Sequence, residues 1–193
     1  MSADFPDPII DDKNQRGKET AVLAGGCFWC VEGVFQQIAG VENVVSGYSG
    51  GEASTAHYDL VCAGTTGHAE SVQVTFDPQK ISYGQILKVF FDMAHDPTQL
   101  NRQGSDRGPQ YRSAIFYSSP EQKKIAEAYI KQLDDAKVFR SPIVTEVVPL
   151  EAFYPAEEHH QNYCSRNPWN PYVQAVAMPK VEKVKDKVPE LAK

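Results

Sequence analysis

The sequence lacks three features that would have pointed to whole classes of protein. No apolar run approaches the roughly 20 residues that span a bilayer, and the first 20 residues, MSADFPDPIIDDKNQRGKET, lack the basic-then-apolar pattern of a signal peptide. Basic residues are also in the minority, with 19 Lys and Arg against 25 Asp and Glu and a formal net charge of -6. Because phosphate backbones and anionic membranes attract clustered basic residues, we expect no nucleic-acid or membrane partner. From the missing signal peptide and membrane span we expect a cytoplasmic protein, and we expect it to be a monomer.

Cysteine is scarce as well, with four residues in 193. In a reducing compartment they are not expected to form a structural disulfide framework, which leaves catalysis, metal binding or simple burial. Two of them belong to the stretch GGCFWC, residues 25–30, where Phe28 and Trp29 separate Cys27 from Cys30. This stretch directly follows the apolar run AVLA, so it lies where a strand gives way to a helix.

The rest of the chain is long and apolar enough, at 41% hydrophobic residues, to bury the core of one globular domain. The patterns predict an extended arm over residues 1–18, a single catalytic domain over 19–178 and a charged, solvated tail over 179–193. Within the domain the predicted order is strand, helix, two strands, helix, strand, then a helix and a strand. That order is typical of an α+β fold, a ferredoxin-like α/β sandwich with a mixed sheet, helices packed on it and a long coil-rich C-terminal region.

Two local features point to a site. A helix start offers unpaired N–H groups, so we expect a lowered pKa for Cys27, and Cys30 lies three residues on, close enough to pair with it. Residues 96–110, DPTQLNRQGSDRGPQ, have no period and many turn formers. A loop of this length is seldom idle in a compact domain, so we expect it to line the site.

Three functions fit these cysteines. A dithiol oxidoreductase would use Cys27 and Cys30 alone, but it would gain nothing from the two rings between them. A zinc-binding interaction module would use Cys27, Cys30, His160 or His159, and Cys164. In the third interpretation, a soft nucleophile beside a Phe and Trp wall attacks an electrophilic sulfur that carries a small apolar group. The zinc module remains the alternative to this enzyme.

Further motifs decide between these interpretations. They are GGCFWC, GYSGG, GHAESVQVTFDP, NRQGSDRGPQYRS, FYPAEEHHQNY and NPWNPY. With them the chain resembles the peptide-methionine (S)-S-oxide reductases from about Thr20 to Lys187. The resemblance implies an α+β sandwich that reduces the S epimer of methionine sulfoxide, free or in proteins. It also implies thioredoxin or a similar reductant as partner, and no metal or organic cofactor.

The resemblance further implies roles for individual residues. The implied set is Cys27 as the nucleophile, Phe28 and Trp29 around the substrate methyl group, Glu70 as the acid, Tyr58 and Tyr111 as hydrogen-bond donors to the sulfoxide oxygen, and Asp106 as a substrate-positioning residue. Attack by Cys27 leaves a sulfenic acid, which needs a second thiol. We expect Cys30 to supply it because of its three-residue spacing, with Cys164 as the alternative resolving cysteine.

Three residues outside this set carry weaker expectations. We expect Cys62 to be buried packing, and His95 to end a helix where a positive charge is favoured. Trp169, in NPWNPY, is expected to cover the site or to hold the C-terminal coil in place.

Overall fold

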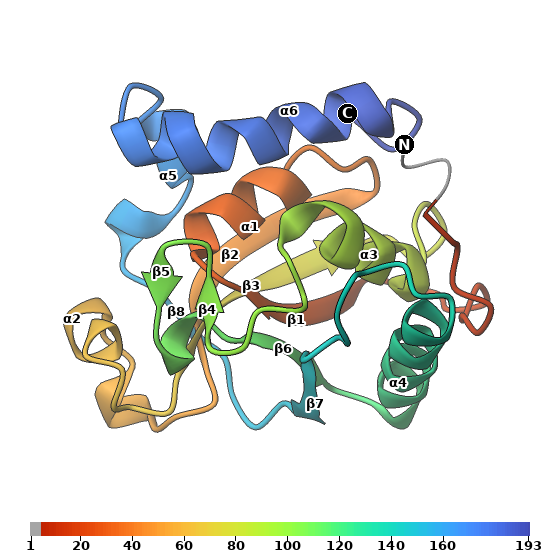
Figure 1. Cartoon of the computed structure of the whole chain (residues 1–193), viewed down its shortest axis with the longest axis horizontal. Helices are drawn as coiled ribbons and strands as arrows, with labels where there is room; N and C mark the ends of the chain where they lie inside the picture. Colours follow the sequence, from red (N-terminus) through yellow and green to blue (C-terminus); the bar gives the residue numbers. More distant parts are fainter. Residues whose placement is uncertain (1–4) are drawn as a thin grey trace.

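The computed structural model describes residues 5–193 and is built on one six-stranded sheet in the order β7-β6-β1-β3-β2-β8 (Figure 1). The strands are β1 (Glu19–Gly25), β2 (Val41–Ser49), β3 (Ala69–Phe76), β6 (Ser113–Tyr117), β7 (Glu146–Pro149) and β8 (Tyr154–Pro155). All neighbours pair antiparallel except β6 and β7, which are parallel, so the sheet is mixed. A separate two-stranded hairpin joins β4 (Arg102–Gln103) to β5 (Asp106–Arg107).

Helices connect and cover these strands. They are α1 (Phe28–Phe35), α2 (Tyr58–Cys62), α3 (Tyr83–Val89), α4 (Pro120–Asp135), α5 (Tyr163–Arg166) and α6 (Met178–Lys187). Short 3-10 turns at Ala53–Thr55, Pro109–Tyr111 and Glu158–His160, and π-helical turns at Phe90–Ala94 and Val173–Ala177, complete the set. The central order β6-β1-β3-β2, with α1 and α3 as its crossovers, confirms the predicted α+β sandwich. Within residues 5–193, no helix has the length and apolar character needed to cross a membrane.

The unbroken apolar run in β1 reflects burial on both faces of the sheet. Ala21 and Leu23 belong to the main core under α1 and α3, whereas Val22 and Ala24 face a smaller cluster. That second cluster is covered by Val148, Leu150 and Phe153 from the C-terminal region. A strand covered on both sides needs apolar residues at every position, which explains the sequence AVLA.

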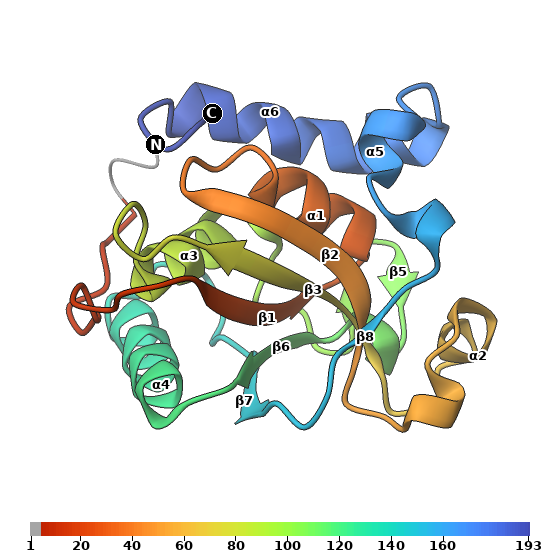
Figure 2. The ribbon, with the colours of Figure 1, turned by 180° about the vertical axis from the view of Figure 1, so that it is seen from behind.

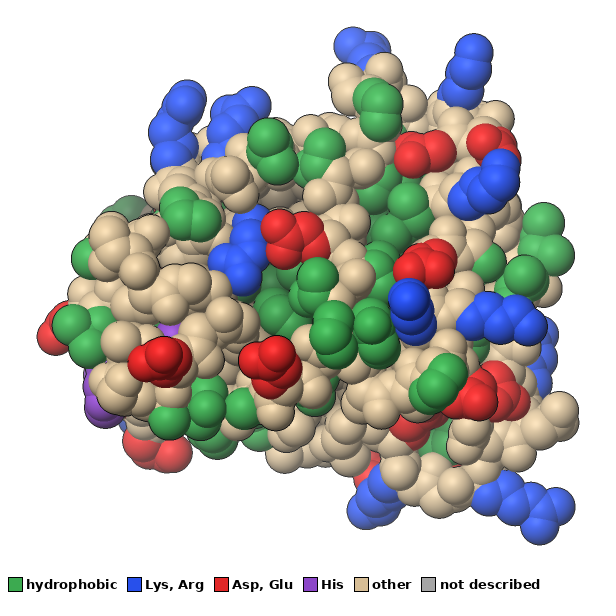
Figure 3. Space-filling model, turned by 90° about the horizontal axis from the view of Figure 1, so that it is seen from below, with side chains coloured by type: hydrophobic (Ala, Val, Ile, Leu, Met, Phe, Trp, Pro, Cys, Tyr) green, Lys and Arg blue, Asp and Glu red, His purple; other side chains and the backbone are tan. Residues whose placement is uncertain are grey.

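On the face opposite α6, acidic and basic side chains are interspersed (Figure 3).

The C-terminal segment is not the solvated tail that the sequence suggested. Helix α6 runs across α1 along the top of the molecule in Figures 1 and 2. Val181, Val184 and Val188 are buried, and the Lys193 N–H donates to the Gln37 carbonyl at 2.8 Å. The expectation of a solvated segment is wrong because valines three and four residues apart form one apolar stripe that packs on α1. The boundary between domain and tail stays a prediction.

The arm is extended but held. Residues 5–18 form neither helix nor strand, and the first four residues of the predicted arm lie outside the described part of the chain. The Asp11 carboxylate accepts hydrogen bonds from Ser82 Oγ at 2.5 Å and from the Gly84 N–H at 2.9 Å, at the start of α3. The Tyr129 hydroxyl donates to the Pro6 carbonyl at 2.6 Å. The arm therefore ties α3 to α4.

Candidate active site

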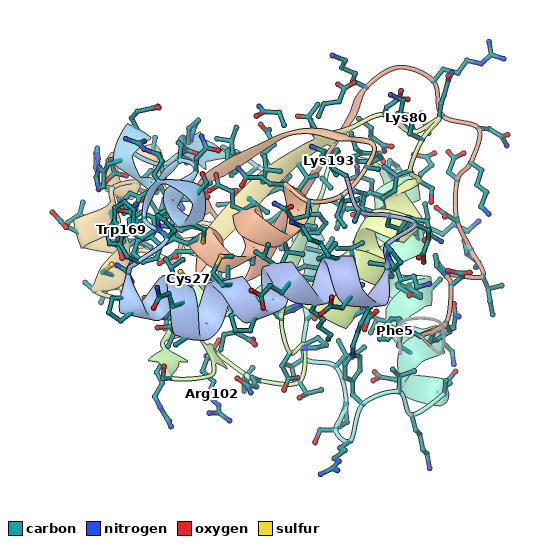
Figure 4. All side chains as sticks on the ribbon, turned by 90° about the horizontal axis from the view of Figure 1, so that it is seen from above. Phe5, Cys27, Lys80, Arg102, Trp169 and Lys193 are labelled. Carbon is teal, nitrogen blue, oxygen red and sulfur yellow. The ribbon has the colours of Figure 1, made fainter. Side chains whose placement is uncertain are left out.

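Cys27 stands at the junction of β1 and α1, as predicted, and serves as the N-cap residue of α1. Gly26 makes the turn possible: its φ of +89° is left-handed, and a Cβ there would lie 2.6 Å from Gln103. The Cys27 side chain is 8% exposed and opens into a cavity of about 200 Å³. In Figure 4, Cys27 lies beside α6 at the same end of the molecule as Trp169.

The loop over residues 96–110 lines this cavity, which confirms that part of the prediction. Gln99, Gln103 and Ser105 contribute from the β4–β5 hairpin and the chain before it. Gln103 is anchored by its side chain, which accepts from the Asp96 N–H at 2.8 Å and donates to the Asp96 carbonyl at 3.0 Å. The loop is therefore fixed over Cys27 by its own hydrogen bonds.

Burial overturns the expected lowered pKa of Cys27. Burial raises the pKa of its thiol well above the usual range, and the hydrogen bond with Cys30 and the charge on Glu70 raise it further. The hydrogen bond from Cys27 lowers the pKa of the Cys30 thiol instead. The helix start is too weak to offset the loss of water around a sulfur as buried as Cys27. In the resting protein the Cys27 thiol is therefore protonated.

Glu70 is a buried acid beside the start of α1. It is the second residue of β3, it is 2% exposed, and its Oε1 accepts the backbone N–H of Phe28 at 3.1 Å. Burial raises its pKa to about 8, although the hydrogen bond from Phe28 opposes the shift. Near neutral pH most of this carboxyl carries its proton and can donate it. A neutral Glu70 also removes one of the charges that hold the Cys27 thiol protonated.

Aromatic rings form a wall next to these two groups. Trp29 is half-buried and stacks on Tyr163 with ring centroids 3.7 Å apart, and its Nε1 donates to His160 Nδ1 at 3.2 Å. Tyr58 stacks on His160 at 4.2 Å. Phe28 is 1% exposed and lies behind the wall, in contact with Trp29 and Tyr58. Tyr163 was not among the predicted site residues, although it is the last residue of the motif HHQNY, which the sequence displays.

Tyr58 and Tyr111 reach the site from different loops. Tyr58 begins α2, and Tyr111 ends the 3-10 turn that follows β5. Burial raises the pKa of both hydroxyls, and the nearby Glu70 carboxyl raises them further. Both hydroxyls therefore stay protonated and available as hydrogen-bond donors. Tyr58 and Tyr111 thus lie near enough to Glu70 for its charge to raise the pKa of both, although more than 50 residues separate the two tyrosines in the sequence.

Asp106 lines the cavity from β5, and it has a partner that the sequence did not suggest. The Tyr172 hydroxyl donates to Asp106 Oδ2 at 2.5 Å and accepts a hydrogen bond from Cys30 Sγ at 3.9 Å. The motif NPWNPY predicted a role at the site for Trp169, whose side chain is 75% exposed. The residue of that motif that enters the cavity is Tyr172.

The comparisons with known proteins agree with this geometry. A family model described as "Peptide methionine sulfoxide reductase" matches residues 19–192. The chain belongs to the peptide methionine sulfoxide reductase family. It is 51% identical to "Peptide methionine sulfoxide reductase MsrA 2" of Synechocystis sp. over 183 residues, 93% of this chain and 86% of that relative.

Solved structures share the fold of this chain. Mxr1 from Saccharomyces cerevisiae in reduced form matches with a TM-score of 0.71 and 33% identity, over 81% of this chain and 91% of that one. Mxr1 in complex with Trx2 matches with a TM-score of 0.50 and 25% identity, over 77% of this chain and 88% of that one. Both matches agree with the α+β fold of this chain.

Three of the four cysteines gather in this reductase site. Cys27, Cys30 and Cys164 belong to one buried cluster with Val173 and Ala177. Cys164, at the start of α5, donates from its Sγ to the Trp29 carbonyl at 3.2 Å. Cys62 is exposed, so its predicted role as buried packing is wrong. The reason is that α2 lies on the surface and buries Val61 rather than its neighbour.

The zinc alternative is not supported. Across residues 5–193, no group of three or more His, Cys, Asp or Glu side chains is arranged to hold a metal ion. His160, the predicted nitrogen ligand, is turned into the aromatic wall with its Nδ1 accepting from Trp29. The imidazole of His160 therefore accepts a hydrogen bond from the Trp29 indole and does not join the sulfur atoms of Cys27, Cys30 and Cys164 in a ligand set.

Proposed function

We propose that the protein reduces the S epimer of methionine sulfoxide, free or in proteins, by thiol chemistry at Cys27. The reaction class follows from membership of the reductase family. The observation that carries the mechanism is the pairing of Cys27 with a buried acid. Glu70 is joined to the first turn of α1 through the Phe28 N–H and keeps its proton up to a pKa of about 8.

In the first step, the sulfoxide oxygen accepts hydrogen bonds from Tyr58 and Tyr111 and a proton from Glu70. Cys27 Sγ attacks the sulfoxide sulfur as its thiol proton passes to the Glu70 carboxylate, which restores the acid. The S–O bond of the sulfoxide breaks, the oxygen stays on Cys27 as a sulfenic acid, and the substrate leaves as methionine. The sulfoxide sulfur gains two electrons and the Cys27 sulfur loses two. Proton donation by Glu70 matters most here because oxygen leaves a neutral sulfoxide poorly.

The aromatic wall is proposed to hold the substrate. Trp29 offers the half-buried ring face and would contact the methyl group, since ring faces and edges attract methyl and sulfur groups. Phe28 is fully buried, so its ring supports Trp29 and Tyr58 from behind. Asp106 would position the substrate from β5, where it lines the cavity with Cys27.

Cys30 is the proposed resolving cysteine. It is hydrogen-bonded to Cys27 and has the lowered pKa of the pair, so it is the better-prepared thiol for attack on the sulfenic acid. Cys164 is the alternative because it lies in the same cluster. Thioredoxin or a similar reductant would then reduce the disulfide, a proposal supported by the solved complex of Mxr1 with Trx2. This recycling suits the reducing cytoplasm, where we place the protein.

The proposal is tested by supplying the purified protein with thioredoxin, its reductase and each epimer of free methionine sulfoxide separately. We expect methionine to form in many turnovers from the S epimer and not from the R epimer. Equal turnover of both epimers would contradict the proposed stereochemistry. Failure to reduce either epimer would contradict the function itself.

A further inference from the structure

The Tyr172 hydroxyl lies between two groups that have to exchange a proton. Cys30 Sγ donates a hydrogen bond to Tyr172 Oη at 3.9 Å, and Tyr172 Oη donates to Asp106 Oδ2 at 2.5 Å. Cys27, Cys30, Asp106 and Tyr172 all line the same cavity. Two hydrogen bonds in series, both pointing the same way, connect the thiol of Cys30 to a carboxylate.

The chain around Tyr172 holds this hydroxyl in place. Asn170 Oδ1 accepts the backbone N–H of Tyr172 at 2.9 Å and that of Val173 at 3.3 Å. Val173 and Ala177, in the π-helical turn that leads into α6, are buried in the same cluster as the cysteines. The tyrosine is therefore fixed by the start of the C-terminal helical segment, and its ring meets Trp29 edge-on with centroids 6.0 Å apart.

Resting on the thiol mechanism proposed above, we propose that Tyr172 is a catalytic residue of the disulfide-forming step and relays the Cys30 proton to Asp106. The direction of the two hydrogen bonds matches this transfer, since each donor already points at the next acceptor. Tyr172 accepts the thiol proton as it passes its own proton to the carboxylate. The hydroxyl is thus unchanged at the end of the step.

The step balances without any outside oxidant. Cys30 loses its proton through Tyr172, and its sulfur forms the S–S bond with the sulfur of the Cys27 sulfenic acid. The S–O bond of Cys27 breaks, and hydroxide leaves with the proton held by Asp106, as water. The Cys30 sulfur is oxidised and the Cys27 sulfur is reduced by the same amount. Since Asp106 and Cys27 line one cavity, the proton is delivered where the hydroxide leaves.

The electrostatics of the site fit a relay rather than a tyrosinate base. Burial, followed by the charges of Cys27 and Cys30, raises the pKa of Tyr172 far above its usual range, so the hydroxyl keeps a proton to pass on. The pKa of Cys30 is lowered first by its hydrogen bond with Cys27 and then by the charge of Lys180. The titratable groups that act on or near Cys30 are Cys27, Lys180, Tyr172, Asp106, Glu70 and Cys164.

The test separates the two chemical steps in Tyr172→Phe. One equivalent of the S epimer is mixed rapidly with reduced protein; methionine release reports the first step, and loss of a dimedone-trappable sulfenic acid reports the second. We expect sulfenic acid decay to slow by at least tenfold more than methionine release, as for loss of a proton-transfer group. Raising the pH should narrow this gap, because Cys30 then ionises without help.

Tyr117→Phe is the matched control, because it removes a hydroxyl outside the cavity, on a ring that lies 5.8 Å from Lys123 Nζ. Disulfide formation at the wild-type rate in Tyr172→Phe, or slowing that no pH restores, would overturn the relay. If that variant does not fold, the solvent isotope effect on sulfenic acid decay in wild-type protein decides, and a value of one overturns the relay. An absence of methionine release from wild-type protein would instead refute the thiol mechanism.

Discussion

The backbone N–H of Phe28 donates a hydrogen bond to Glu70 Oε1 at 3.1 Å. This contact joins the residue after Cys27, at the start of α1, to the second residue of β3. It holds the Glu70 carboxyl against the first turn of α1, the helix whose N-cap residue is Cys27. The same carboxyl is buried deeply enough to hold its proton near neutral pH, so nucleophile and acid are placed by one backbone contact.

Replacing Glu70 with Gln should slow methionine release in a single turnover by about 10²–10⁴-fold, because the amide keeps the shape and the hydrogen bond but has no proton to give. In wild-type protein the rate should also fall as the pH rises through about 8, where Glu70 loses its proton. The Gln variant should lack that decline. Glu121→Gln, in the first turn of α4, serves as control. Wild-type rates in Glu70→Gln would exclude the acid role.

Glu32 gives a prediction about stability. It is 1% exposed on α1, its Oε2 has no hydrogen-bond partner, and burial raises its pKa to about 7 despite backbone hydrogen bonds from Asn162 and Tyr163. A raised pKa means that its contribution to stability is full below the unfolded value near 4.5 and is lost as the pH rises through about 7.

The free energy of unfolding of Glu32→Gln, measured relative to that of wild type, should therefore rise by on the order of 2 kcal/mol between pH 4.5 and pH 9. Denaturant unfolding of both proteins at the two pH values measures this. A difference that does not change with pH would show that Glu32 does not titrate in the folded protein as expected.

The packing of α6 can be tested at Val184, which is 0% exposed and faces α1. Val184→Ala should lower the free energy of unfolding by about 2 kcal/mol, because two methyl groups are lost and a cavity is left. Lys185→Ala, the exposed neighbour on the same helix, should have almost no effect. Equal losses in the two variants would mean that α6 does not pack as described.

The two buried candidates for the resolving thiol make opposite predictions. Cys30→Ser should release about one methionine per protein and then stop, because the Cys27 sulfenic acid cannot be recycled by thioredoxin. Cys164→Ser should keep cycling, since in the wild-type protein the Cys164 thiol is hydrogen-bonded to the Trp29 carbonyl and not to Cys27. Steady-state turnover with thioredoxin measures both. Cycling by Cys30→Ser and not by Cys164→Ser would reverse the assignment.

Much of the fold could be predicted because local patterns and tertiary packing agree. The Ser119 cap of α4 is an example: Ser119 precedes Pro120 and is followed three residues later by Gln122, which is a capping pattern, and its side chain accepts the Gln122 N–H at 3.2 Å. The cavity-lining role of residues 96–110 was likewise predictable from length and composition. These features depend on neighbours in the sequence, which a single chain displays directly.

Most of the errors share one physical cause, which is burial that the sequence does not show; Cys62, predicted to be buried and found exposed, is the opposite case. His95 does end a helical turn, but it is buried. Its two ring nitrogens form hydrogen bonds with the Phe90 carbonyl and with Ser113 Oγ. Burial lowers its pKa to about 4, so the expected positive charge is absent. The same cause raised the pKa of Cys27 and hid Tyr172, whose partners Cys30 and Asp106 lie far from it in the chain.

The most direct measurement of the central claim is a single turnover of the S epimer by reduced Cys27→Ser, compared with wild type and with Cys62→Ser. We expect one methionine per molecule, and a sulfenic acid or disulfide that maps to Cys27, in wild type and Cys62→Ser. No methionine should form in Cys27→Ser. Substantial methionine release by the Cys27 variant would contradict the account.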